Sequence, residues 1–116
     1  MTMDIQTEDF HIWFDPSTST IHLSGVIRLA GPDAYAPITL LLEQAADAST
    51  SSLTIDVKGL KLLNSSGIHM LSKFMIRQRK QETLQMRILG SRQVEWQNKT
   101  LVTLKRLLPS LVLDLD

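Results

Sequence analysis

The strongest constraint on the fold of this chain is a regular alternation of helix-like and strand-like segments after residue 30. Strands that are joined through helices favour parallel pairing with right-handed crossovers. The helix-like segments span about residues 37–47, 66–79 and 93–108, and the strand-like runs lie at 53–57, 85–89 and 111–113. The pattern therefore predicts one compact α/β unit, with Pro37 as the residue at which the regular part of the first helix begins.

The N-terminal part of the chain has the pattern of a β-hairpin. Phe10, Ile12 and Phe14 alternate with less apolar residues, residues 15–19 have turn chemistry, and alternation resumes over residues 21–29. Together the segments predict a single domain over residues 1–116, with about four to five strands in a mixed sheet, an N-terminal β-hairpin and three main helices. Residues 1–8 are expected to form a short N-terminal tail.

The composition excludes several classes of function. The chain has 116 residues, of which 43% are hydrophobic, and it has no cysteine, so disulfides, thiolate metal sites and thiol catalysis are excluded. The three histidines are isolated and lack the short spacings of zinc ligands, so we expect no metal and no cofactor. No stretch is long and apolar enough for a membrane span, and residues 1–10 do not form a signal peptide, which favours a cytoplasmic protein.

The charges are distributed unevenly along the chain. Residues 1–56 contain eight acids and one base, for a net charge of 1 − 8 = −7, and residues 57–116 contain eleven bases and four acids, for 11 − 4 = +7. Several of the bases end helix-like segments, where cations complement the helix dipole. No aromatic residues are interleaved with the bases, as stacking on nucleic-acid bases would require. We therefore expect no direct binding of nucleic acid.

The segment from Asp56 to Ile68 is the most informative part of the chain for function. It has the sequence Asp-Val-Lys-Gly-Leu-Lys-Leu-Leu-Asn-Ser-Ser-Gly-Ile, which predicts the end of a buried strand, a short loop and the start of a helix. An asparagine or serine there caps the helix by accepting a hydrogen bond from a backbone N–H, and Gly67 allows a tight turn or close packing. Ser65 is thereby expected where unpaired N–H groups tolerate negative charge.

The same segment resembles the signature of the STAS domain family (sulfate transporter and anti-sigma factor antagonist). That signature runs Asp-x-x-Gly-apolar-x-apolar-apolar-Asp-Ser-Ser/Thr-Gly-apolar, and the order of predicted elements agrees with the family's fold. The resemblance implies a non-enzymatic regulator, similar to a free-standing anti-sigma factor antagonist, that binds a protein partner. Its implied partners are a serine kinase that is also the anti-sigma factor, and a phosphatase.

The resemblance also assigns roles to individual residues. Ser65 matches the serine that the partner kinase phosphorylates, which releases the complex. The implied switch-loop and partner-binding residues are Asp56, Asn64, Ser66, Gly67, Ile68 and His69. Asn64 departs from the family's acid at this position, with two consequences left open: the missing charge either weakens recognition of Ser65 by a kinase or stabilises the modified form.

Two other functions fit parts of the same pattern. The alternative to partner switching is that the chain is a STAS-type accessory subunit of a transport system or a small-ligand-binding module. Ser65 and His69 are four residues apart and could share a helix face as a nucleophile and its base. No acid is placed to orient His69 and a continuous helix provides no oxyanion hole, so we do not expect an enzyme.

Overall fold

The computed structural model describes residues 3–81 and 83–116. In these residues the strands are β1 (Asp4–Gln6), β2 (Phe10–Asp15), β3 (Thr20–Ile27), β4 (Ser52–Leu63), β5 (Gln85–Gly90) and β6 (Val112–Leu115). The helices are α1 (Gly31–Ala48), α2 (Ser65–Gln81) and α3 (Glu95–Leu107). The described residues thus form a single mixed sheet with three helices, which confirms the predicted fold class.

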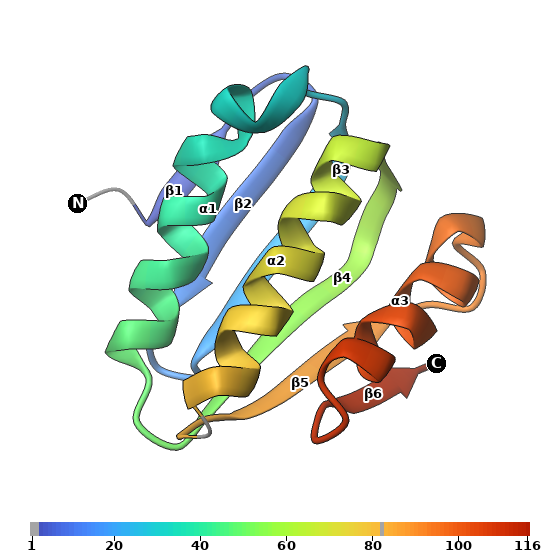
Figure 1. Cartoon of the computed structure of the whole chain (residues 1–116). Coiled ribbons are helices and arrows are strands. Elements are labelled where there is room, and N and C mark those ends of the chain that lie inside the picture. The colour runs from blue at the N-terminus through green and yellow to red at the C-terminus, as the bar shows by residue number, and fades with distance from the viewer. Residues whose placement is uncertain (1–2, 82) are drawn as a thin grey trace.

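The strands lie in the sheet in the order in which they occur along the chain. β1, β2 and β3 pair antiparallel, whereas β3, β4, β5 and β6 pair parallel. Each parallel connection contains one helix, and all three helices cover the same face of the sheet (Figure 1). Because α1 and α2 follow neighbouring parallel strands, they run in the same direction, and their N-termini lie at the same end of the molecule.

The hydrophobic core lies between the sheet and the helical layer. Ile21 and Leu23 of β3 and Ile55 and Val57 of β4 point towards the helices and are almost fully buried. Their partners in the helical layer are the buried faces of the helices, with residues such as Leu41. Full burial of one such side chain stabilises the fold by about 1.5–3 kcal/mol relative to exposure. The more polar residues that alternate with these apolar ones point to the opposite face of the sheet.

The N-terminal residues differ from the expected tail. Asp4–Gln6 forms β1, and Ile5 lies opposite Ile12 of β2. Asp4 reaches the other face, where its carboxylate accepts a hydrogen bond of 2.9 Å from Nε2 of His11. Only one of these three residues is apolar, and three residues are too few to show the alternation that indicates a strand. The segment forms a strand because it pairs with β2.

Strand β4 is much longer than the run of residues 53–57 that the sequence indicated. It continues through the expected loop to Leu63, and two irregularities in its register with β3 absorb extra residues on β4. Pairing with β5 ends at Asp56 opposite Leu89, so the second half of β4 has no strand on that side.

Helix α3 replaces the missing strand beside β4. The buried side-chain amide of Gln97 donates hydrogen bonds of 2.7 and 3.1 Å to the carbonyl oxygens of Val57 and Leu60, and its oxygen accepts one of 2.8 Å from the N–H of Ser91. The indole of Trp96 donates a further 2.9 Å bond to the Leu60 carbonyl. Buried carbonyl groups require such partners, so α3 makes the extended strand possible.

Helix α1 begins six residues before the expected start at Pro37. Gly31 has a positive φ of 82° at the junction with the preceding segment, and Pro37 lies inside the helix. Proline provides no N–H for the carbonyl of Asp33, but Asp33 is exposed and water can satisfy that oxygen. Within residues 3–81 and 83–116, none of the helices is both long and apolar enough to cross a membrane.

Candidate functional site at the N-terminus of α2

Asn64 is the N-cap of α2, and so fills the role that the sequence left open between an asparagine and a serine. Its Oδ1 accepts a 3.1 Å hydrogen bond from the N–H of Gly67 and a 2.5 Å bond from the hydroxyl of Tyr35. Its Nδ2 donates a 2.9 Å bond to the carbonyl of Leu29, and its backbone N–H donates to the carbonyl of Ile27. One residue therefore joins the end of β3, the start of α1 and the first turn of α2.

This network gives a physical reason for an amide at position 64. Asn64 accepts two hydrogen bonds through its oxygen and donates one through its nitrogen. An ionised aspartate can only accept, so it would keep the bonds from Tyr35 and Gly67 but would face the Leu29 carbonyl without a proton. The surrounding groups thus match asparagine better than the acid of the STAS signature.

Gly67 is required for close packing. A Cβ at this position would lie 2.2 Å from Cδ1 of Leu63 and 2.7 Å from the hydroxyl oxygen of Tyr35, both far inside van der Waals contact. The absence of a side chain allows Tyr35 to reach Asn64 over the first turn of α2. Of the two roles that the sequence left open for Gly67, close packing is the one observed.

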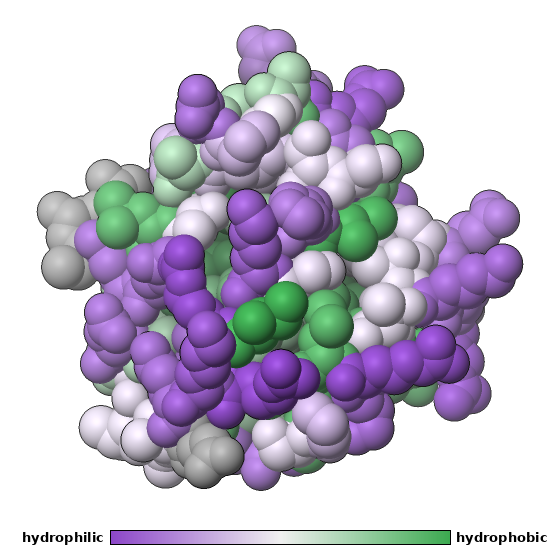
Figure 2. Space-filling model, viewed as in Figure 1, coloured by the Kyte–Doolittle hydropathy of each residue, from purple (hydrophilic) through white to green (hydrophobic). Residues whose placement is uncertain are grey.

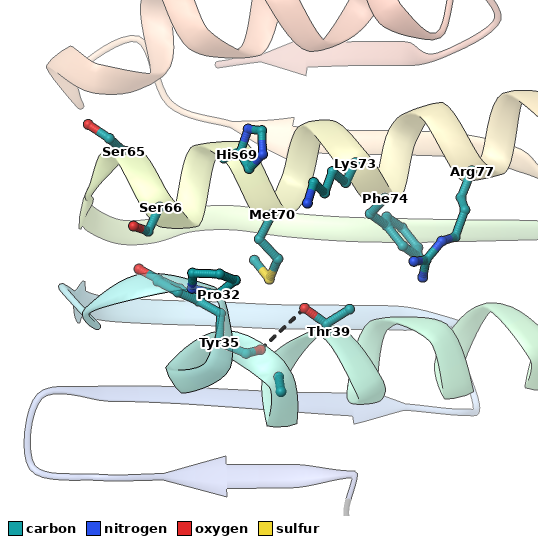
Figure 3. A pocket seen from close by; sticks show the side chains of 11 residues that line it. Pro32, Tyr35, Thr39, Ser65, Ser66, His69, Met70, Lys73, Phe74 and Arg77 are labelled. Atoms are coloured by element: carbon teal, nitrogen blue, oxygen red, sulfur yellow. Dashed lines mark hydrogen bonds between the residues drawn. The ribbon is translucent and has the colours of Figure 1, made fainter.

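Ser65 and Ser66 occupy the first turn of α2 in different surroundings. Ser65 is exposed and Ser66 is half-buried. The Ser65 hydroxyl points outwards from the end of the helix, whereas Ser66 is turned towards α1 (Figure 3). Among the described residues, no acceptor is bonded to the N–H of either serine. These free donors and the helix dipole favour an anion at this end of α2.

A groove between α1 and α2 begins beside these serines. It has a volume of about 560 Å³. Its lining comprises Pro32, Tyr35, Ala36 and Thr39 of α1 and Ser65, Ser66, His69, Met70, Lys73, Phe74 and Arg77 of α2. Met70 and Phe74 point from α2 towards α1 (Figure 3). Tyr35 and Lys73 cannot be recognised as groove residues from the sequence, because a groove between two helices depends on how the helices pack and has no motif in either helix.

The charges around the groove are mostly positive. Lys73 and Arg77 belong to α2, and Arg77 forms an ion pair with Glu43 of α1. Among the described residues, Lys73 has no carboxylate within ion-pair distance. In the view of Figure 2, apolar surface on the helical layer is surrounded by hydrophilic side chains. The groove thus combines an apolar lining with one cation that no acid balances.

Asp56 lies apart from the other predicted site residues. Instead of ending its strand beside α2, it lies in the middle of β4, between the buried residues Ile55 and Val57, and so on the sheet face opposite the helices. Its carboxylate is 3.5 Å from Nδ1 of His22, whose ring stacks on Trp13 with centroids 4.4 Å apart. Of the predicted site residues, Asn64, Ser65, Ser66, Gly67, Ile68 and His69 lie together at the start of α2, and Asp56 does not.

No hydrogen bond joins Ser65 to His69 within the part of the chain that the structure describes. In the same residues, no group of three or more histidine, aspartate and glutamate side chains is arranged to hold a metal ion. The chemical capacity of the site lies in an exposed hydroxyl at a helix N-terminus and an adjoining apolar groove.

Comparison with known proteins supports the fold. No protein-family model and no curated protein matches the chain. A chain in the crystal structure of the diguanylate cyclase SiaD in complex with its activator SiaC, from Pseudomonas aeruginosa, is similar with a TM-score of 0.70 and 14% identity, covering 99% of this chain and 100% of that chain. SiaC of P. aeruginosa is similar with a TM-score of 0.64 and 14% identity, covering 99% and 96% of the two chains. At this identity, the likeness establishes a shared fold over nearly the whole length.

Proposed function

We propose that this chain is a non-enzymatic regulatory protein that binds a protein partner at the N-terminus of α2, and that phosphorylation of Ser65 controls this binding. The observation that carries the proposal is the setting of Ser65. It is exposed on the first turn of α2, beside unused N–H groups, while Asn64 alone provides the cap. Modification of Ser65 therefore disturbs no contact on which the fold depends.

The physics of phosphorylation suits this position. A phosphate adds close to two negative charges and three acceptor oxygens. At a helix N-terminus these oxygens can accept hydrogen bonds from the free N–H groups, and the helix dipole favours the charge. The phosphorylated chain would keep its fold, whereas a partner packed against Ser65 would meet a bulky, solvated anion. The modification would therefore release the partner without unfolding the domain.

Two kinds of partner are consistent with this proposal. The resemblance to STAS domains suggests a serine kinase that also serves as anti-sigma factor, together with a phosphatase. The structural neighbour SiaC is described as the activator of the diguanylate cyclase SiaD. By analogy, the partner of this chain is either such a kinase or an enzyme whose activity depends on binding.

The test compares phosphomimetic and non-phosphorylatable variants. Ser65→Glu should weaken binding to the protein that co-purifies with the wild-type chain, and Ser65→Ala should bind at least as tightly as the wild type. The matched control is Ser51→Glu, an exposed serine at the opposite end of β4. Equal affinities of the two Ser65 variants would refute the switch. Mass spectrometry of the chain from its native cell should place phosphate on Ser65.

The alternative function, a small-ligand-binding module, is favoured by one specific observation, which is the groove of about 560 Å³ beside Ser66. Drug-sized and cofactor-sized ligands occupy cavities of roughly 300–1,000 Å³. Ligand binding and partner binding are compatible, because the groove runs along α1 and α2 whereas the Ser65 hydroxyl points outwards from the helix end (Figure 3).

A further inference from the structure

The groove between α1 and α2 has the size and shape of a site for a slender molecule. Its lining on α2 runs from Ser65 to Arg77, which at the rise of an α-helix corresponds to a length of about 18 Å. At the far end, the ion pair between Arg77 and Glu43 connects the two helices. The result is an elongated trough with a defined end.

The floor of the groove is apolar and already formed. Tyr35, Met70 and Phe74 are at most 8% exposed, so packing holds them in place. Pro32 and Ala36 of α1 add apolar surface. The phenol oxygen of Tyr35 is bonded to Asn64, which leaves its ring for the groove. An apolar chain placed here would cover this surface without displacing any hydrogen bond of the protein.

The charges select the kind of polar group that such a molecule can carry. Arg77 is neutralised by Glu43, whereas Lys73, one helical turn earlier, has no acidic partner among the described residues. Lys73 lies beside the groove, between Met70 and Phe74 (Figure 3). The free N–H groups at the start of α2 also favour an anion. A cationic head group would be repelled by Lys73, and a neutral one would lack the charge interaction.

We propose that this groove binds an elongated apolar molecule with a single carboxylate, of the class of medium-chain fatty acids. The carboxylate pairs with Lys73, and the aliphatic chain lies over Phe74, Met70 and Tyr35. The proposal does not depend on phosphorylation of Ser65. Because Tyr35 holds the cap residue Asn64, an occupant of the groove would contact a side chain that helps to position the turn carrying Ser65.

The test uses three probes with the same twelve-carbon chain: dodecanoate, dodecanol and dodecyltrimethylammonium, each below its aggregation concentration. Two-dimensional amide NMR spectra of the whole chain should show saturable shifts with dodecanoate, confined to α1 and α2. Dodecanoate should bind at least about tenfold more tightly than either other probe, as expected for one added charge interaction. Equal binding of all three, or shifts spread over the open face of the sheet, would refute the proposal.

Variants separate the contributions of charge and shape. Lys73→Gln should reduce dodecanoate affinity about tenfold and leave dodecanol unaffected, because only the charge interaction is lost. Ala36→Trp, at an exposed position, should fill the groove and abolish binding of dodecanoate. Lys80→Gln is the matched control outside the groove and should bind as the wild type does. An unchanged affinity in Lys73→Gln would overturn the assignment of the carboxylate.

One more arm distinguishes this proposal from the partner switch. Ser65→Glu and Ser65→Ala should bind dodecanoate with similar affinity, because Ser65 lines only the end of the groove, two helical turns or about 12 Å along α2 from Lys73. If no probe binds while a purified protein partner shifts the groove residues, the groove is a protein-docking surface and the ligand proposal is wrong. If the probe binds but the Ser65 variants bind the partner equally, only the switch is wrong.

Discussion

The hydroxyl of Tyr35 in α1 donates a hydrogen bond of 2.5 Å to Oδ1 of Asn64, the residue that caps α2. Tyr35 and Asn64 are 29 positions apart in the sequence, and their bond fixes the start of one helix against the start of the next. The Tyr35 side chain is also part of the groove lining. Tyr35 therefore belongs both to the cap of α2 and to the groove between α1 and α2.

Tyr35→Phe should lower the free energy of unfolding by about 1 kcal/mol, the typical contribution of a hydrogen bond, because the aromatic packing is kept. Urea unfolding measures this value. A double-mutant cycle with Asn64→Ala should show that the two changes are not additive, since each removes the same bond. Additive effects would mean that the bond does not contribute to stability.

Tyr35 should also make the stability of the protein depend on pH. Burial raises the pKa of the Tyr35 phenol above its ordinary value of 10.0, and a backbone hydrogen bond with Leu29 partly opposes this effect. In the alkaline range the unfolded chain therefore loses this proton first, and stability falls as the pH rises through about 10 and above. Below that range the phenol is protonated in both states and makes no contribution to the pH dependence.

Tyr35→Phe removes this source of alkaline destabilisation. Between about pH 8 and about pH 11 the wild type should lose more stability than the variant, as measured by urea unfolding at each pH. Lysines titrate in both proteins, so the difference isolates Tyr35. Because the chain has one tyrosine, the ultraviolet absorbance of tyrosinate gives an independent titration. Parallel stability curves for the two proteins would contradict the prediction.

Asn64→Asp should lower the free energy of unfolding by about 1–3 kcal/mol at neutral pH, because the Leu29 carbonyl loses its donor and faces a carboxylate. Asn64→Ala should cost more, since it removes the helix cap and leaves the Tyr35 hydroxyl without its acceptor. Thermal and urea unfolding measure the order of the two variants. A fully stable Asn64→Asp variant would show that the amide nitrogen is dispensable.

Gly67→Ala should destabilise the protein by about 1–3 kcal/mol, although alanine is the better helix former, because the new methyl group overlaps Leu63 and Tyr35. Ser66→Ala, on the same turn, is the control and should change stability by less than about 1 kcal/mol. Comparison of their urea midpoints checks the prediction. A stabilised Gly67→Ala variant would mean that the first turn of α2 can move away from Tyr35.

Gln97→Ala should lower the free energy of unfolding by about 3 kcal/mol or more, since three hydrogen bonds are lost in a fully buried position. Trp96→Phe, which removes only one bond to the Leu60 carbonyl, should have the smaller effect. Hydrogen exchange should accelerate in the second half of β4 in Gln97→Ala. Unchanged exchange there would show that α3 does not support this part of the strand.

The sequence predicts the parts of the fold that depend on local patterns. Periodicity indicates the hairpin, the three helices and the parallel strands, and residue chemistry indicates that an asparagine or serine caps the helix after residue 63. These features are visible because each depends on neighbours within a few residues. The fold class follows from the order of these elements.

The sequence does not reveal features that depend on distant partners. The extension of β4 to Leu63 depends on Gln97, 40 positions beyond Val57, and a strand that continues through Gly59 resembles a loop when read locally. Asp56 was expected at the end of the strand for the same reason. Residues 4–6 form β1 because they pair with β2. The groove forms where α1 packs beside α2.

The contact between Gln97 and β4 also bears on how molecules of this protein meet one another. A bare strand edge attracts a strand from another molecule, and long flat edges lead to aggregation. The second half of β4 would be such an edge, but a side-chain amide occupies its carbonyl groups. The two outer strands, β1 and β6, have only 3 and 4 residues. Gln97 thus uses hydrogen-bonding groups of β4 that a strand from a second molecule would need for pairing beside the segment that leads to Ser65.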